Sequence, residues 1–208
     1  MEIVIASKNK GKIKEIRHFF SNSLLSQSVQ NIKWLTFEDF NNFPEIDEGS
    51  ESFVENAKLK ACRAAEFTGK IALADDSGLE VDALGGRPGV TSSRYAGPDA
   101  TDEKNRKKLL TELKDISSIK KRSARFRCMM ALFGPDNGII NLSEGVCEGK
   151  IGFTEIGTNG FGYDSIFIPE GFDKTMAELS NSEKNSISHR GKALAELARF
   201  LKSLPERS

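Results

Sequence analysis

Apolar positions at the start of the chain change from a continuous run to a helical stripe. Residues 3–6 form a short apolar run that predicts a buried strand, and the apolar positions between residues 13 and 20 follow at helical spacing. Residues 21–31 are rich in Ser, Asn and Gln and predict a loop, whereas residues 32–37 predict a second strand. The pattern therefore begins as strand, helix, strand.

A second helix is predicted to begin at residue 52. Ser52 and Glu55 have the spacing of a capping box, and Gly69 is typical of a helix end. Between them an apolar stripe occupies one helical face, formed by Phe53, Ala57, Ala61, Ala64 and Ala65. Lys60 falls near this buried face, where a lysine needs an anionic partner.

The next predicted strand, residues 71–75, leads into two adjacent carboxylates and then a Ser-Gly step that predicts a turn. Neighbouring side chains of a strand point to opposite faces, so Asp75 and Asp76 cannot share one role. One can face a cleft while the other faces a helix end or backbone amides. Carboxylates at a strand end suit Mg²⁺; the alternative is that either aspartate only closes an Asx turn with Gly78.

The second half of the chain predicts a helix, a hairpin and a final helix. Thr101 or Asp102 is expected to cap a helix whose apolar stripe lies between residues 109 and 113. Residues 124–132 alternate with strand period, and a Gly-Pro-Asp-Asn-Gly turn leads to a partner strand over residues 139–147. The final helix is expected over about residues 188–203.

This order of elements predicts the fold class. Helices alternate with strands in the first half and a hairpin follows, which is typical of a mixed, curved α/β sheet flanked by helices. Residues 1–208 are expected to form a single domain with two lobes, because no linker separates them. The turn-rich segment near residues 85–100 is the best hinge candidate.

Composition argues against a nucleic-acid-binding, membrane-spanning or secreted protein. The 30 basic and 30 acidic residues balance, which gives no reason to expect nucleic-acid binding. No apolar run approaches the roughly 20 residues of a membrane helix, and no secretory signal is evident at the N-terminus. The three widely spaced cysteines predict reduced thiols and a cytoplasmic protein.

Three further segments are candidates for chemistry. Residues 7–12, Ser-Lys-Asn-Lys-Gly-Lys, precede a helix and form either a phosphate site or a solvated basic turn. In residues 160–164, glycines flank Phe161, whose ring either stacks on a base or belongs to the core. Ser188 is a candidate N-cap, so His189 and Arg190 fall in the first helical turn, where cations need a compensating anion or acceptor.

Five motifs in order resemble the Ham1 or inosine triphosphate pyrophosphatase family. They are "SKNKGK", "SFVENAKLKA", "ADDSGLEVDALGGRPGVTSSRYAG", "GTNGFGYDSIFIP" and "EKNSISHRGKAL", and they span residues 7 to 193. The resemblance implies a mixed α/β fold with two lobes around a central substrate cleft, usually in a homodimer. It also implies hydrolysis of ITP, dITP and XTP to the monophosphate and pyrophosphate, with Mg²⁺ as cofactor and no nucleic-acid or membrane partner.

The resemblance also implies roles for residues. Asp76 would be the proton acceptor, and Glu48 and Asp76 would hold the metal. Lys60 would reach the phosphates. The other residues matched to the family's substrate site are Ser7, Lys8, Asn9, Lys10, Gly11, Lys12, Ser77, Phe161, Gly162, Tyr163, Asp164, Lys184, His189 and Arg190. Asn159 stands where many members have glycine, which Asn tolerates if the position needs positive φ.

Base selection follows from hydrogen-bond chemistry. Hypoxanthine and xanthine present an acceptor at C6, whereas adenine presents a donor. Lys184 and Arg190 are donors only and His189 can donate, so adenine would leave buried donors unpaired at about 1–3 kcal/mol each. Guanine keeps the C6 oxygen, so this argument explains why ATP would be rejected but does not explain rejection of GTP.

Two other functions compete with this interpretation. A Maf-like pyrophosphatase would act on modified pyrimidine nucleotides, although the "SHRG" and "FGYD" segments favour purines. A non-catalytic nucleotide sensor would use the same pocket without hydrolysis. A sensor has no need for the water-activating carboxylate that Asp76 is expected to provide.

Overall fold

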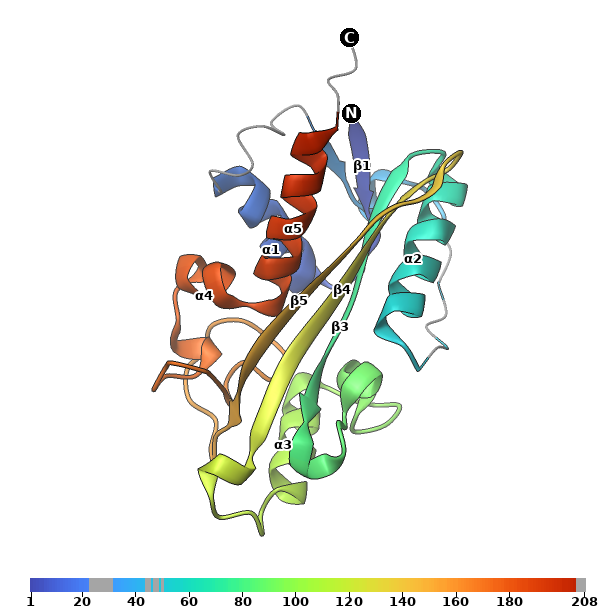
Figure 1. Cartoon of the computed structure of the whole chain (residues 1–208). Helices are drawn as coiled ribbons and strands as arrows, with labels where there is room; N and C mark the ends of the chain where they lie inside the picture. The colour runs from blue at the N-terminus through green and yellow to red at the C-terminus, as the bar shows by residue number, and fades with distance from the viewer. Residues whose placement is uncertain (23–31, 44–45, 47–48, 50, 205–208) are drawn as a thin grey trace. The chain divides into compact units, whose positions relative to one another are not determined.

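A computed structural model describes residues 1–22, 32–43, 46, 49 and 51–204 and shows a mixed α/β fold (Figure 1). Six strands form one sheet in the order β2-β1-β3-β4-β5-β6. The strands are β1 (Glu2–Ile5), β2 (Lys33–Leu35), β3 (Ile71–Val81), β4 (Ser123–Gly134), β5 (Gly138–Ile151) and β6 (Phe167–Pro169). The helices are α1 (Lys10–Asn22), α2 (Phe53–Thr68), α3 (Asp102–Glu112), α4 (Asn181–Ile187) and α5 (His189–Ser203). The predicted fold class is confirmed.

The sheet mixes parallel and antiparallel pairs. β1 lies between β2 and β3 and is parallel to both, with Val4 opposite Leu35 on one side and Ala72 on the other. β5 and β6 are antiparallel, with Gly149 opposite Pro169. The predicted hairpin is formed by β4 and β5, which are neighbours in the sheet and are joined by three residues.

The chain divides into two compact units. The first contains residues 1–76, 128–145 and 190–208, and the second contains residues 77–127 and 146–189. The boundaries fall inside β3, β4 and β5 and at the start of α5. The turn-rich segment near residues 85–100, expected as a hinge, therefore lies wholly within the second unit.

In the first unit, side chains from its strands alternate between two apolar clusters. Ile3, Ile5 and Leu73 pack with buried residues of α1 and α5. Val4 and Ala72, which point the opposite way, pack with the buried face of α2. Both faces of these strands are therefore covered, with α1 and α5 on one side and α2 on the other (Figure 1).

The face between α2 and the strands is built from small side chains. Ala57, Ala61, Ala64 and Ala65 of α2 meet three strand alanines, Ala72, Ala74 and Ala131. All seven are at most 2% exposed. Because methyl groups meet methyl groups, the helix axis can approach the strands closely. The predicted apolar stripe and the left-handed stop at Gly69 (φ 63°) are both confirmed.

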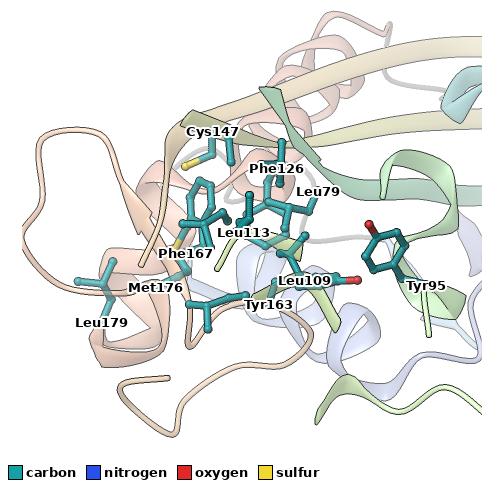
Figure 2. Close-up of a cluster of buried hydrophobic side chains, with 14 residues drawn as sticks. Leu79, Tyr95, Leu109, Leu113, Phe126, Cys147, Tyr163, Phe167, Met176 and Leu179 are labelled. Carbon is teal, nitrogen blue, oxygen red and sulfur yellow. The ribbon is translucent and has the colours of Figure 1, made fainter. Parts of the chain in front are cut away.

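The second unit has its own apolar core, shown in Figure 2. Leu109 of α3 and Leu113, the residue directly after that helix, are fully buried there, beside Phe126, Tyr163 and Phe167. Thr101 caps α3 by accepting a hydrogen bond from the Lys104 amide at 3.2 Å. The predicted helix, its cap and its stripe are thus confirmed.

Two local predictions were wrong, and a third element was only partly foreseen. β3 does not end at a turn after Asp76 but continues to Val81, so neither aspartate closes an Asx turn at a strand end. Ser52 is the N-cap of α2, yet its side chain makes no capping hydrogen bond; Glu55 instead accepts from Lys58 at 2.8 Å. The final helix, predicted over about residues 188–203, is confirmed as α5, which begins directly after the extended residue Ser188 (ψ 154°); the short helix α4 before it was not predicted.

Two other expectations are partly outside the described residues. Residues 21 and 22 of the predicted loop belong to α1, and 23–31 are not described. Among the described residues, no helix combines the length and apolar character needed to cross a bilayer.

Gly149 is required by the close contact between β5 and β6. A Cβ atom at this position would lie 2.4 Å from the Ile168 carbonyl oxygen and 2.6 Å from the Phe167 ring. We expect Gly149→Ala to destabilise the fold by about 1–3 kcal/mol, because a buried ring and backbone must shift. Chemical denaturation would measure the change.

Gly152→Ala is the matched control. Its Cβ would meet its nearest neighbours at 3.5 Å, an ordinary contact. Equal stability changes in the two variants would show that the contact at Gly149 is not the cause.

Candidate active site

The two adjacent aspartates of β3 lie on opposite faces of the strand, as predicted. Asp75 shares the face of Leu73, which α1 and α5 cover, and Asp76 shares the face of Ala74, which α2 covers. Both residues are buried, with exposed fractions of 2% for Asp75 and 4% for Asp76. A buried carboxylate needs charged or hydrogen-bonding partners, so each face must supply its own.

Asp76 receives its partners from α2. Its Oδ1 lies 3.1 Å from the Lys60 ammonium nitrogen, and its Oδ2 accepts a hydrogen bond from the Asn56 amide at 3.0 Å. Asn56 and Lys60 are 1% and 7% exposed. The predicted anionic partner of Lys60 is therefore Asp76.

Asn56 was missed as a site residue, although the sequence carries its signal. It lies one helical turn before Lys60, inside the stripe that begins at Phe53. Two polar residues four apart within an otherwise apolar stripe indicate a shared polar partner on the facing strand.

Asp75 receives its partners from α1 and α5. Its Oδ2 lies 3.0 Å from the Lys12 ammonium nitrogen and 3.1 Å from Nη2 of Arg190. Arg190 also donates through Nη1 to Glu15 of α1. The first-turn cation of α5 thus has the compensating anions that the helix dipole predicted.

The pKa of Asp75 reflects two opposing effects. Burial raises it, but the positive charges of Lys12, Arg190 and Lys60 outweigh burial and hold the pKa well below its usual range. For Arg190, burial lowers the pKa, but the negative charges of Asp75 and Glu15 outweigh this effect. The pKa is therefore raised overall and the guanidinium stays charged. Asp75 therefore stays ionised throughout the neutral range.

The segment from Ser7 to Lys12 forms the N-terminus of α1. The Asn9 side chain accepts a hydrogen bond from the Lys12 amide at 3.1 Å, and the Ser7 hydroxyl accepts from the Asn9 amide at 3.2 Å. Helical geometry gives the amides of Lys10 and Gly11 no partner within the helix. Lys8 and Lys10 are exposed beside them, so the end of α1 combines amide donors with positive charge.

In the second unit, Phe161 and Lys184 lie together. The lysine ammonium is 5.0 Å from the centre of the Phe161 ring. It is also 2.7 Å from Oδ2 of Asp164, which accepts the Phe161 amide at 2.9 Å. The buried Asp164 carboxylate thus connects the loop that carries Phe161 to Lys184 of α4.

Gly160 makes this arrangement possible. Its φ is +81°, and a Cβ there would lie 2.0 Å from the Asp164 carboxylate. Asn159 does not occupy such a conformation, because Asn42 is the single non-glycine residue with positive φ in the described chain. Its side chain instead donates to the Leu179 carbonyl at 3.1 Å, so the substitution leaves the loop geometry intact.

α3 supports the same loop, a role the sequence did not reveal. The Gly162 amide donates to Asp102 at 2.7 Å, and the Gly162 carbonyl accepts from Arg106 at 2.8 Å. These two residues are one turn apart on α3, so their common target follows from helical spacing. Pairing across more than fifty residues leaves no local pattern in the sequence.

Two predicted substrate residues of this unit belong to its core. Tyr163 is 4% exposed, and its hydroxyl donates to the Ser92 carbonyl at 2.8 Å (Figure 2 shows its ring in the cluster). His189 is 6% exposed and stacks on Phe126, with ring centres 4.7 Å apart. Their contact with a substrate stays a prediction.

The predicted metal ligands are only partly described. Glu48 lies outside the described residues. Asp76 supplies a buried carboxylate, and Ser77, half-buried, continues the strand beyond it. In the described part of the chain, no group of three or more His, Cys, Asp or Glu residues forms a metal cage. One or two carboxylates, completed by phosphate oxygens and water, are the donor set that Mg²⁺ prefers, so the residues present fit that ion.

The Asp75 network predicts a pH-dependent contribution to stability. Folding lowers the pKa of Asp75. The ion pairs of Asp75 therefore stabilise the protein at pH values above 3.8, the ordinary pKa of the group, and this stabilisation is lost as the pH falls below that value. We expect Asp75→Asn to cost about 3–5 kcal/mol at pH 7, because buried cations lose their partner. The difference from the unaltered protein should narrow below about pH 4.

Thermal unfolding of both proteins between about pH 7 and pH 3 would measure this difference. Asp115→Asn is the control, because Asp115 is exposed on its surface turn. A difference for Asp75→Asn that is constant with pH would contradict the lowered pKa.

Comparisons with known proteins cover nearly the whole chain. A model of the Ham1 family matches residues 3–200. A protein named dITP/XTP pyrophosphatase from Bacillus licheniformis is 47% identical over 200 residues, covering 96% of this chain and 97% of that protein. A protein of the same name from Desulforamulus reducens is 46% identical over 204 residues, covering 98% of this chain and 97% of the relative.

Solved structures agree with the sequence comparison. A HAM1 protein from Coxiella burnetii has a TM-score of 0.85 and 43% identity, covering 98% of this chain and 100% of its own. The Ham1 protein of Staphylococcus aureus has a TM-score of 0.82 and 40% identity, covering 97% and 98%. The resemblance inferred from the motifs is confirmed: this chain belongs to the Ham1 family.

Proposed function

We propose that this protein hydrolyses non-canonical purine nucleoside triphosphates, dITP, ITP and XTP, to the monophosphate and pyrophosphate. The observation that carries the proposal is the buried Asp76 carboxylate, held by Lys60 and Asn56. The full-length relatives named dITP/XTP pyrophosphatases support the choice of substrate. Removal of such nucleotides would keep deaminated purines out of nucleic acid.

The N-terminus of α1 would bind the triphosphate. The amides of Lys10 and Gly11 point out of the first helical turn, where the helix dipole favours anions. Lys8, Lys10 and Lys12 add positive charge at the same helix end. Together they can hold a polyanion whose charge would otherwise oppose attack at phosphorus.

Asp76 would act as general base. Water attacks the α-phosphorus, the bond to the oxygen bridging the α and β phosphates breaks, and pyrophosphate leaves. The proton of the attacking water passes to the Asp76 carboxylate. Lys60 and Asn56 fix the carboxylate by one contact to each oxygen, and Lys60 supplies positive charge for the phosphates.

The charge balance of the first unit is an argument for a divalent cation. In the ion pairs around the two aspartates of β3, three cations face three carboxylates: Lys12, Lys60 and Arg190 against Glu15, Asp75 and Asp76. A triphosphate adds several negative charges to this balanced set. We propose that Asp76 and Glu48 hold Mg²⁺, which when bound would neutralise and polarise phosphoryl oxygens.

Phe161, Lys184 and His189 would recognise the base. The Phe161 ring offers an apolar face for stacking, and Lys184 lies beside it as a donor. A C6 oxygen accepts from such a donor, whereas the adenine amino group does not. In this proposal Gly162 and Asp164 shape the loop, because they carry its contacts to α3 and α4.

The family resemblance extends the proposal to a cytoplasmic homodimer. Cys62, Cys128 and Cys147 form no disulfide in the described part of the chain, in keeping with a reducing compartment. Light scattering of the purified protein would give its oligomeric state directly.

The substrate class is tested by pyrophosphate release. ITP, XTP, GTP, ATP and dUTP would be compared at equal concentration, with Mg²⁺ and with a chelator. We expect release from ITP and XTP to exceed release from ATP at least tenfold, because each unpaired donor costs more than about 1 kcal/mol, and to stop with chelator. Tight ITP binding without release would identify a sensor instead, and preference for dUTP would favour the Maf-like alternative.

Asp76→Asn tests the general base. The amide keeps the size of the side chain but cannot take a proton, so we expect kcat to fall on the order of 10²-fold or more. Asp115→Asn serves as the control for aspartate substitution, and thermal unfolding checks that both variants fold. Near-normal turnover by Asp76→Asn would remove this residue from the mechanism.

A further inference from the structure

The backbone on both sides of Phe161 is held at successive peptide groups. The Phe161 amide donates to Oδ2 of Asp164 at 2.9 Å, and the Phe161 carbonyl accepts from the Asp164 amide at 3.2 Å. The Gly162 amide donates to Oδ2 of Asp102 at 2.7 Å, and the Gly162 carbonyl accepts from Nη1 of Arg106 at 2.8 Å. Because peptide groups are planar, these contacts fix the backbone torsions of Phe161 and Gly162. The Phe161 ring then keeps only the freedom of its own rotamers.

Gly162 depends on contacts from outside the loop. Its φ is +62°, and a Cβ atom placed there would meet nothing within 4 Å. Crowding therefore does not restrict this residue, and a glycine has more backbone freedom than any other residue. Gly160, on the other side of Phe161, differs because the Asp164 carboxylate lies against it. The hydrogen bonds from α3 are thus what restricts the Gly162 backbone.

The two α3 residues that hold Gly162 are themselves fixed in place. Asp102 and Arg106 are four residues apart and so share one face of the helix. Glu155 orients Arg106 by accepting from its Nε at 2.7 Å, and the Arg106 side chain is 17% exposed. Asn105, which is 2% exposed, accepts the Ala96 amide at 2.7 Å. α3 is therefore anchored independently of the loop that it holds.

α4 holds the loop by a separate route. The Lys184 ammonium lies 2.7 Å from Oδ2 of Asp164 and 5.0 Å from the centre of the Phe161 ring. Lys184 and Asp164 are each 5% exposed. These buried contacts remain when the α3 side chains are removed, so we expect loss of the α3 contacts to loosen Phe161 without unfolding the loop.

We propose that Asp102 and Arg106 are positioning residues that hold Phe161 as a preformed stacking surface for the purine base. The inference rests on the proposed function, in which Phe161 stacks on the base. A loop that already has its bound conformation spares the cost of ordering it when the substrate binds. Stacking is the same before and during hydrolysis, so the pair strengthens substrate binding and leaves the chemical step unchanged.

Two ligands separate binding of the base from binding of the phosphates. Inosine monophosphate carries the base with one phosphate, whereas inorganic tripolyphosphate has no base. Calorimetry would give both dissociation constants for the unaltered protein, Asp102→Ala, Arg106→Met and the double variant. We expect inosine monophosphate to bind about 3-fold more weakly to each single variant and about 10-fold more weakly to the double variant, because binding must then order the loop. Tripolyphosphate binding should not change.

The neighbouring pair on α3 is the matched control. Glu103 and Lys107 have the same charges and the same spacing, one position further along the helix, and both are exposed. The double variant Glu103→Ala/Lys107→Met removes equal charges from the same turns and should bind inosine monophosphate normally. Asp102→Asn keeps an oxygen that can accept from the Gly162 amide, so it should recover most of the affinity lost in Asp102→Ala. Thermal unfolding would check that every variant folds.

Steady-state kinetics with ITP is the second readout. KM should rise in parallel with the dissociation constant for inosine monophosphate, while kcat should stay within about twofold. Unchanged inosine monophosphate affinity and KM in the double variant would overturn the proposal. Equal weakening of inosine monophosphate and tripolyphosphate would also overturn it, because the loss would then not be specific to the base. If the double variant fails to fold, Asp102→Ala and Arg106→Met carry the same test singly.

The inference and the proposed function can fail separately. Inosine monophosphate binding needs no hydrolysis, so a protein inactive on ITP can still show the dependence on Asp102 and Arg106. Conversely, a protein that hydrolyses ITP with the same KM in the presence and absence of the α3 contacts retains the function and loses the inference. If the unaltered protein binds neither inosine monophosphate nor ITP, the positioning role is overturned.

Discussion

The burial of two adjacent carboxylates on one strand is the constraint on which the site depends. In β3, Asp75 and Asp76 point to opposite faces, and helices cover both faces. Neither charge can reach bulk water, so each must be met by cations from the helices on its own side. α2 supplies Lys60 to one face, and α1 and α5 supply Lys12 and Arg190 to the other. The helix end proposed to bind the phosphates and the proposed general base are thereby both connected to this pair of adjacent residues.

Much of this arrangement follows from local rules. Two-residue alternation separates the aspartates, and helical spacing places Lys60 on the buried stripe of α2 and predicts that it has an anionic partner. The helix dipole predicts an anion for Arg190. Each rule states that a partner must exist without naming it. The mixed sheet, the hairpin and the stop at Gly69 were predictable because turn residues and apolar period are local signals.

The rest depends on contacts between distant parts of the chain. Glu15 meets Arg190 across 175 residues, and Asp102 meets Gly162 across 60; no period in the sequence records such pairs. The continuation of β3 through Ser77 and Gly78 also defeats local reasoning, because pairing in the sheet overrides the turn preference of these two residues. α4 was missed because its seven residues show no apolar stripe, and its capping box at Ser180 and Glu183 is the signal that remained.

The alanine face of α2 has a consequence for how this protein tolerates change over evolutionary time. Asn56 and Lys60 reach Asp76 only because the helix lies close to the strands, and seven alanines set that closeness. A larger side chain at any of them would lift the helix and withdraw both polar groups together. A substitution at a position with no chemistry of its own would thus disturb the site as directly as a change to the polar residues themselves. Substitutions on the outer face of α2 meet no such limit, whereas the alanine positions of its inner face have room only for the smallest side chain that still has a methyl group.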